Sequence, residues 1–83
     1  MRYLIVFRSM TQAQRAAAIL MHHHISVTIT RPSLAAGKGS CSAALEIAET
    51  DLSAAKNWIE KTTLRPLAFY QIARDGTLRE VFS

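Results

Sequence analysis

The sequence predicts an α+β fold in which strands and helices follow one another in the order β-α-β-β-α-β, with one more strand near the C-terminal end. Three observations lead to this expectation. Strand-length apolar runs alternate with two segments whose apolar residues recur at helical spacing. Capping residues precede both helical segments, and proline or an Asp-Gly pair marks the breaks. The length of 83 residues suits one small domain, residues 1–83.

The first strand and first helix have the clearest signals. The continuous apolar run Tyr3–Phe7 is typical of a strand that is buried on both faces at the centre of a sheet. Ser9 stands three residues before Gln12, which is the spacing of a capping box, and predicts a helix over about Thr11–His23. Four apolar side chains share one face of this helix: Ala13, Ala16, Ala17 and Leu20. The helix is therefore expected to pack through a flat, alanine-rich face.

The next two strands are predicted on either side of a loop. Ile25–Thr30 alternates strictly, so we expect a strand with its Ile/Val face buried. Arg31-Pro32 ends this strand, because proline cannot donate a hydrogen bond to a neighbouring strand. After a loop that reaches about Ser40, the alternation over Ala43–Ile47 predicts the third strand.

The second helix and fourth strand follow. Thr50 and Asp51 are residue types that cap helices, and Arg65-Pro66 is expected to end the helix that they begin. The predicted core stripe of this helix contains Leu52, Ala55 and Ile59, with Trp58 at its flank. Leu67–Ala73 then reads as the fourth strand.

The C-terminal part predicts a β-hairpin extension. Asp75-Gly76 is a turn signal, and Thr77–Phe82 is expected to return as a short fifth strand or an ordered tail. The complete order is that of a ferredoxin-like sandwich, with two helices on one face of an antiparallel sheet. In this topology four parts of the chain meet at one end of the sheet. They are the end of the first strand, the start of the first helix, the loop before the third strand and the end of the second helix. Six residues should gather there: Arg8, Ser9, Arg31, Lys38, Cys41 and Arg65.

Cys41 is the only cysteine and lies in the glycine-containing stretch Gly37–Ser42. Nearby cations and a helix N-terminus favour the thiolate, which is the nucleophilic form of the side chain. The predicted reactive residue is therefore Cys41, and the residues expected to support it or to bind an anion are Arg8, Ser9, Arg31, Lys38, Ser40, Ser42 and Arg65. The alternative is that Cys41 packs as an inert small residue at the strand start.

The histidines do not extend this site. His22, His23 and His24 are expected at the far end of the first helix, so no general base is predicted beside the thiol. Consecutive helical residues point about 100° apart, so no metal site is predicted either. His24 is expected on the core face as a buried histidine. With one cysteine, an internal dithiol couple is excluded, and the prediction is a thiol that carries a group or docks with another protein.

The charge and composition limit the classes of partner that we expect. Ten Lys and Arg stand against six Asp and Glu, and this net charge of +4 could favour anionic partners, although a solvated surface that happens to be basic is the favoured explanation. Nucleic acid is not favoured, since Trp58 is predicted on a helix and the strand aromatics lack an RNA-binding pattern. Lys38 stands in a loop that precedes a strand, unlike the lysine of a phosphate-binding loop, and no cofactor is predicted. The single free thiol and the absence of a signal peptide or a membrane-length apolar run predict a cytoplasmic location.

The residues also support a family resemblance. It rests on the opening run with Ser9, on the strand beginning at Ile25, and above all on Ser40-Cys41-Ser42-Ala43-Ala44-Leu45 followed by Asp51. In these features the chain resembles the small selenium/sulfur carrier protein-like domains grouped as DUF3343. The resemblance covers about residues 2–59. It implies that Cys41 holds sulfur as a persulfide, or selenium in the equivalent form, between a cysteine desulfurase-like donor and an acceptor protein. Ser42 stands where glycine is typical of the family.

Two functions therefore remain open. The first is a non-enzymatic carrier that works through Cys41. The second is an interaction or regulatory module that does not use the thiol and whose basic end binds an acidic protein, a small anion or nucleic acid. A homodimer through the face or the edge of the sheet is a further option.

Overall fold

The computed structural model describes residues 1–30 and 43–82 of the chain. Its strands and helices are, in order, β1 Arg2–Phe7, α1 Met10–His22, β2 Thr28–Thr30, β3 Ala43–Ala48, the 3-10 helix η2 Glu49–Asp51, α2 Leu52–Glu60, β4 Ala68–Ile72 and β5 Leu78–Phe82. Within the described residues, neither helix combines the length and apolar character that a membrane crossing requires.

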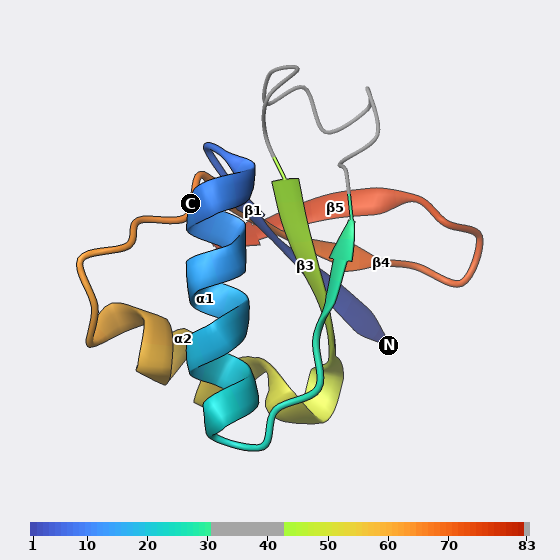
Figure 1. Ribbon diagram of the computed structural model, residues 1–83. Coiled ribbons are helices and arrows are strands. Elements are labelled where there is room, and N and C mark those ends of the chain that lie inside the picture. The colour runs from blue at the N-terminus through green and yellow to red at the C-terminus, as the bar shows by residue number, and fades with distance from the viewer. Residues whose placement is uncertain (31–42, 83) are drawn as a thin grey trace.

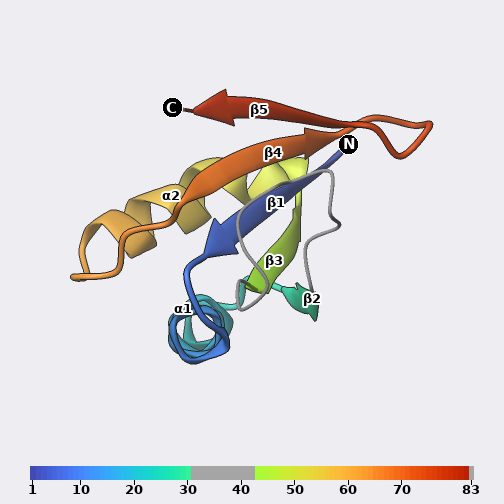
Figure 2. The ribbon, with the colours of Figure 1, turned by 90° about the horizontal axis from the view of Figure 1, so that it is seen from above.

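The five strands form one sheet in the order β2-β3-β1-β4-β5, and every neighbouring pair is antiparallel. In this arrangement β1 lies at the centre of the sheet, as the continuous apolar run predicts. The order of the first four strands is that of a ferredoxin-like fold, and β5 adds one strand outside β4 (Figures 1 and 2). The predicted fold class is confirmed.

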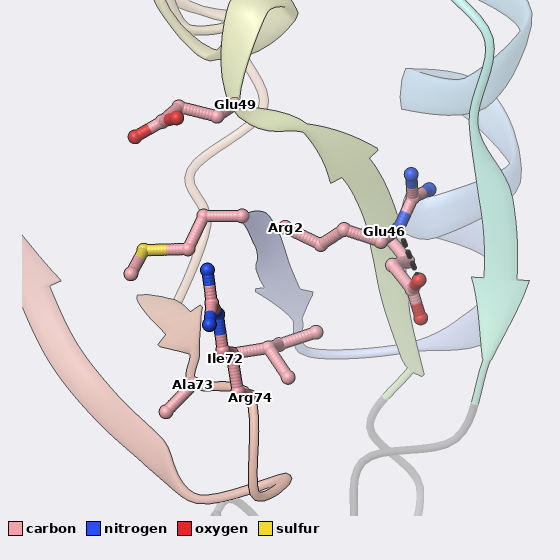
Figure 3. Close-up of a pocket in the computed structure, with 7 residues that line it drawn as sticks. Arg2, Glu46, Glu49, Ile72, Ala73 and Arg74 are labelled. Carbon is pink, nitrogen blue, oxygen red and sulfur yellow. Dashed lines mark hydrogen bonds and ion pairs between the residues drawn. The ribbon is translucent and has the colours of Figure 1, made fainter.

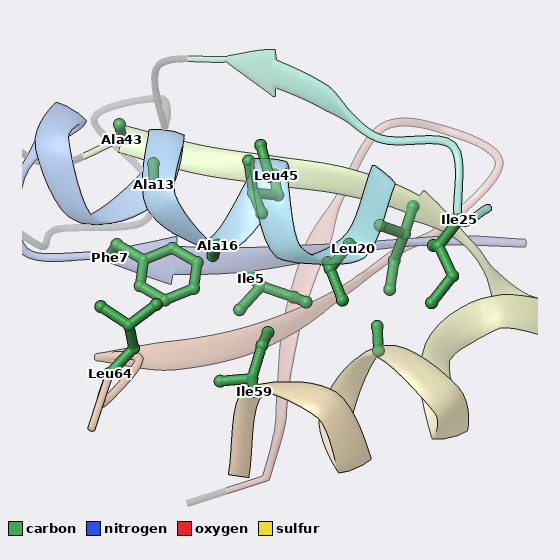
Figure 4. Packing of buried hydrophobic residues seen from close by; sticks show 13 residues of the cluster. Ile5, Phe7, Ala13, Ala16, Leu20, Ile25, Ala43, Leu45, Ile59 and Leu64 are labelled. Carbon is green, nitrogen blue, oxygen red and sulfur yellow. The ribbon is translucent and has the colours of Figure 1, made fainter. Parts of the chain in front are cut away.

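The main core lies between the sheet and both helices. Alternate residues of β1, Ile5 and Phe7, point toward the helices and are fully buried together with Leu45 of β3. Figure 4 shows α1 and α2 over this same face, with Leu20 and Ile59 directed into the shared interior. Burial of these large side chains is the main favourable contribution to folding.

A second buried cluster occupies the opposite face of the sheet. It contains Leu4, Val6, Ala44, Ala68 and Tyr70. Because side chains alternate between the two faces of a strand, burial of both sets makes β1 apolar at almost every position. This explains why its sequence shows no polar alternation.

α1 forms as its pattern predicts. Ser9 has extended backbone angles, and its Oγ accepts the N–H of Gln12 at 3.3 Å. The four predicted contact residues are all buried: Ala13, Ala16, Ala17 and Leu20. The reciprocal half of the predicted capping box is missing, since the Oε1 atom of Gln12 is buried and has no hydrogen-bond partner among the described residues.

β2 is shorter than predicted and begins at Thr28 rather than Ile25. The N–H of Ile25 bonds to the carbonyl of Leu20 at 3.0 Å, so this residue still belongs to the turn that ends α1. His24 has a φ of 63° in that turn. Ile25 is buried, whereas Ile29 is 40% exposed because β2 is an edge strand, so the prediction of a wholly buried Ile/Val face was wrong.

The start and end of α2 also differ from the expectation. Glu49–Asp51 form a short 3-10 helix, and neither this turn nor α2 has a side-chain cap, so Thr50 and Asp51 do not cap the helix as predicted. The helix ends at Glu60, well before Arg65-Pro66. Thr62 explains the early end, because its hydroxyl donates to the carbonyl of Ile59 at 2.7 Å and accepts the N–H of Leu64 at 3.1 Å. Serine and threonine side chains compete with helical hydrogen bonds in this way.

The C-terminal hairpin forms at the predicted turn. Gly76 has a φ of 87°, which glycine adopts without steric cost. The Oδ1 of Asp75 accepts the N–H of Thr77 at 2.9 Å and also the Thr77 hydroxyl. Beyond this turn β5 pairs with β4, with a shift in register between Phe69 and Tyr70.

Candidate functional site

The end of β1 is where the sequence places the candidate site. Phe7 at the end of β1 pairs with Ala43 at the start of β3, and Thr30 at the end of β2 pairs with Ala44. Figure 1 shows the start of α1, the start of β3 and the end of β2 at the same end of the molecule. Of the residues predicted to gather there, Arg8 and Ser9 follow β1 directly, and Arg8 is exposed. Arg65 is also described, whereas the other residues predicted at this end lie outside the described part of the chain: Arg31, Lys38, Ser40, Cys41 and Ser42.

The N-terminus of α1 contributes positive charge to this end. Ser9 supplies the cap, and its carbonyl accepts the N–H of Ala13 at 3.1 Å. The first turn contains no acidic side chain. The dipole of this helix is therefore not neutralised locally, and the exposed Arg8 adds a full charge directly before it. An anionic group near this end would be stabilised by both.

Arg65 reaches the same end through the segment that follows α2. The N–H of Leu67 donates to the carbonyl of Val6 at 2.7 Å, and Ala68 pairs with Val6. The Nη1 atom of Arg65 donates to the carbonyls of Thr62 at 3.2 Å and Leu64 at 3.0 Å. The main chain around Arg65 thus meets the last residues of β1, although its guanidinium is held by its own segment. Sequence reasoning missed these two bonds, since they depend on the turn that Thr62 creates.

The histidines lie away from this end, as predicted. His22 ends α1, about 18 Å along the helix axis from its first residue. His23 stacks on Trp58 of α2, with ring centres 3.5 Å apart and planes inclined by 4°. The Nζ of Lys61 lies 4.7 Å from the centre of the Trp58 ring. This cluster joins the end of α1 to the end of α2.

His24 contradicts the prediction of a buried histidine. It is exposed and lies beyond the last helical residue, with a left-handed backbone conformation. The helical wheel failed here because the helix ends before this residue. Among residues 1–30 and 43–82, no group of three or more histidine, cysteine or acidic side chains is arranged to hold a metal ion.

A hollow of about 460 Å³ lies at the opposite end of the sheet, where β1 begins and β3 and β4 end. Figure 3 shows Arg2 paired with Glu46 across neighbouring strands, whereas Glu49 and Arg74 lie apart from each other on its walls. No sequence motif marks this hollow, because its lining residues come together only through the strand order. It contains none of the residues predicted for the site.

Comparison with known protein families gives a match over most of the chain. Residues 2–71 match the family described as "Putative Se/S carrier protein-like". No curated protein and no solved structure matches the chain. The matched region contains the four strands and two helices of the ferredoxin-like unit almost to the end of β4, and it contains Cys41. Because the match spans most of its length, the chain belongs to the Se/S carrier protein-like family.

Proposed function

We propose that the protein carries sulfur or selenium on the thiol of Cys41 and passes it between a donor and an acceptor protein. The observation that carries this proposal is the family match over residues 2–71, joined to the presence of a single cysteine within it. The charge at the end of β1 agrees with it: Arg8 and the uncompensated start of α1 favour anions such as a thiolate. Cys41 itself stands two residues before Ala43, which pairs with the last residue of β1.

The transfer needs no redox partner. The Cys41 thiolate attacks the outer sulfur of a persulfide on the donor protein, the bond between the two donor sulfurs breaks, and the donor cysteine leaves as a thiolate. Cys41 then holds the sulfur as Cys41–S–SH, with its proton. A thiolate or another nucleophile on the acceptor repeats the same displacement, which restores the Cys41 thiolate. Selenium is transferred by the corresponding step from a donor selenopersulfide.

This role requires no autonomous catalytic site. The donor, in our proposal a cysteine desulfurase, forms the persulfide with its own cofactor, and the carrier supplies a reactive thiol and a surface for docking. A persulfide also requires a compartment in which the thiol is not lost to disulfide formation, so we place the protein in the cytoplasm.

The experiment is intact-mass measurement after incubation with a purified cysteine desulfurase and cysteine. We expect a gain of one sulfur atom that a reductant reverses, and a gain of one selenium atom when selenocysteine replaces cysteine. Cys41→Ser should stay unmodified, and Ser42→Ala, which keeps the thiol and changes only its neighbour, should still be loaded. A denatured sample treated with a thiol reagent controls for access to Cys41.

An unmodified mass of the native protein, with the thiol freely accessible, would contradict the proposal. In that case the function that remains is the interaction module that does not use the thiol. Full activity of Cys41→Ala in cells would also contradict the carrier function and leave the interaction module.

A further inference from the structure

A groove between α2 and β4 has the form of a docking site. It measures about 300 Å³ and is lined by Lys56, Ile59, Glu60, Leu64, Arg65, Pro66 and Phe69. Ile59 and Leu64 are buried core residues that form part of its floor, and Phe69 of β4 packs against the same core cluster. An occupant would therefore meet an apolar surface that is continuous with the interior of the protein.

Arg65 gives the rim of this groove a fixed positive charge. Its Nη1 atom donates to the main-chain carbonyls of Thr62 and Leu64, at 3.2 Å and 3.0 Å. A guanidinium has five donors in a planar fork, so bonding through one nitrogen leaves the other edge for a carboxylate. A side chain already held in place loses less conformational freedom when it binds a partner.

The groove lies beside the segment that meets the end of β1. Leu67, two residues after Arg65, bonds to Val6 near the end of β1. Ala43, two residues after Cys41 in the sequence, pairs with Phe7 at the end of the same strand. A protein that approaches this end of β1 can thus place a neighbouring segment in the groove.

We propose that this groove, defined by the lining residues above, binds a segment of the sulfur-donor protein that presents a large apolar side chain next to a carboxylate. The apolar side chain lies on the half-buried Pro66 and Phe69, above the buried Ile59, and the carboxylate pairs with Arg65. The inference rests on the proposed carrier function for the identity of the partner. The chemistry of the segment rests on the groove alone. The net charge of +4 favours the approach of such an acidic partner.

The first test uses a short acetylated and amidated peptide with leucine next to aspartate as the probe, titrated into isotope-labelled protein and followed by NMR. We expect saturable shifts of the amide signals of Ile59, Leu64 and Phe69. Arg65→Gln should weaken binding roughly five- to tenfold, and an asparagine peptide should lose a similar factor. The matched control is Arg79→Gln, which removes an exposed arginine on β5 that does not line the groove, and this variant should bind as the native protein does. Absence of saturable shifts, or equal binding of the asparagine peptide, would overturn the proposal.

The second test connects the groove to transfer. Arg65→Gln should raise the protein concentration that gives half-maximal sulfur loading by the desulfurase, without lowering the final extent of loading. If the native protein is loaded and Arg65→Gln is loaded at the same concentrations, the donor does not use the groove and the inference is wrong. If the native protein is not loaded at all, the carrier function fails instead, while peptide binding by Cys41→Ala still decides whether the groove exists as a site.

Discussion

Replacing Ile5 by alanine tests the burial of β1 at the centre of the sheet. Ile5 is fully buried at the centre of the sheet and points into the core shared by both helices. The change removes roughly three methylene equivalents, which corresponds to about 2.4 kcal/mol at about 0.8 kcal/mol each. The cavity left behind raises the expected loss of unfolding free energy to about 3–4 kcal/mol. A domain of this size has a total of about 4–12 kcal/mol, so the variant should lose a large part of its stability.

Urea unfolding, followed by circular dichroism and by the fluorescence of the single tryptophan, measures this loss. The melting temperature should fall by about 15–25 °C. Ile29→Ala is the matched control, because Ile29 is the same residue type on an edge strand and is 40% exposed. It should cost less than about 1 kcal/mol. Equal losses of unfolding free energy for the two variants would refute the reasoning that the core forms at the centre of the sheet and not at its β2 edge.

Three further predictions concern single contacts. Ser9→Ala should lower the unfolding free energy by about 1 kcal/mol because α1 loses its cap, and Ser9→Asp should retain most of it; equal stability of all three proteins in urea would contradict the cap. The hydrogen bond from the Thr77 hydroxyl, followed by that from its N–H, holds the pKa of Asp75 below its ordinary value of 3.8. The ionised Asp75 therefore stabilises the folded state above the ordinary pKa, and this contribution is lost as the pH falls through the lowered pKa. The difference in unfolding free energy between the native protein and Thr77→Val, measured in urea, should be present at neutral pH and vanish in strong acid. A difference that persists in acid would exclude this origin. His23→Ala should cost about 0.5–1.5 kcal/mol and change the emission of Trp58, and His23→Phe, which keeps a stacked ring, should restore stability; unchanged emission in His23→Ala would show that the stack does not form in solution.

The sequence predicts the elements whose signal is periodic burial. The apolar run in β1, the alanine face of α1 and the alternation in β3 each reflect a surface that must face the core, so all three appear where expected. The strand order follows from the element order, because the ferredoxin-like topology is the simplest way to bury both helices on one face.

The ends of elements were predicted less well, because local hydrogen bonds decide them. The Ile25 N–H completes the turn after α1, and the Thr62 hydroxyl bonds to the carbonyl of Ile59 where α2 ends. Neither contact is visible in a periodic pattern. The exposure of Ile29 depends on whether its strand lies at the edge, which only the assembled sheet reveals.

For the candidate site, the sequence predicted that Arg8, Ser9 and Arg65 share one end of the sheet, but it did not predict the contacts that they make there. Arg8 and Ser9 lie after β1 as expected, and Arg65 comes to the same end through the contact of Leu67 with Val6. The two carbonyls that fix the Arg65 guanidinium, and the groove beside it, arise from a turn that no motif announces. The role of Cys41 stays a prediction.

The pairing of β4 with β5 limits how copies of this protein can join. Ala73 donates to the carbonyl of Thr77, and bonded pairs alternate along an antiparallel ladder, so every second residue of β5 directs its main-chain groups outward. A second copy that added its own β5 in the two-fold register centred on Glu80, the middle residue of the strand, would align Glu80 with Glu80. Like charges directly opposite each other are destabilising. That register of β5 with β5 is therefore disfavoured at the outer edge of the hairpin.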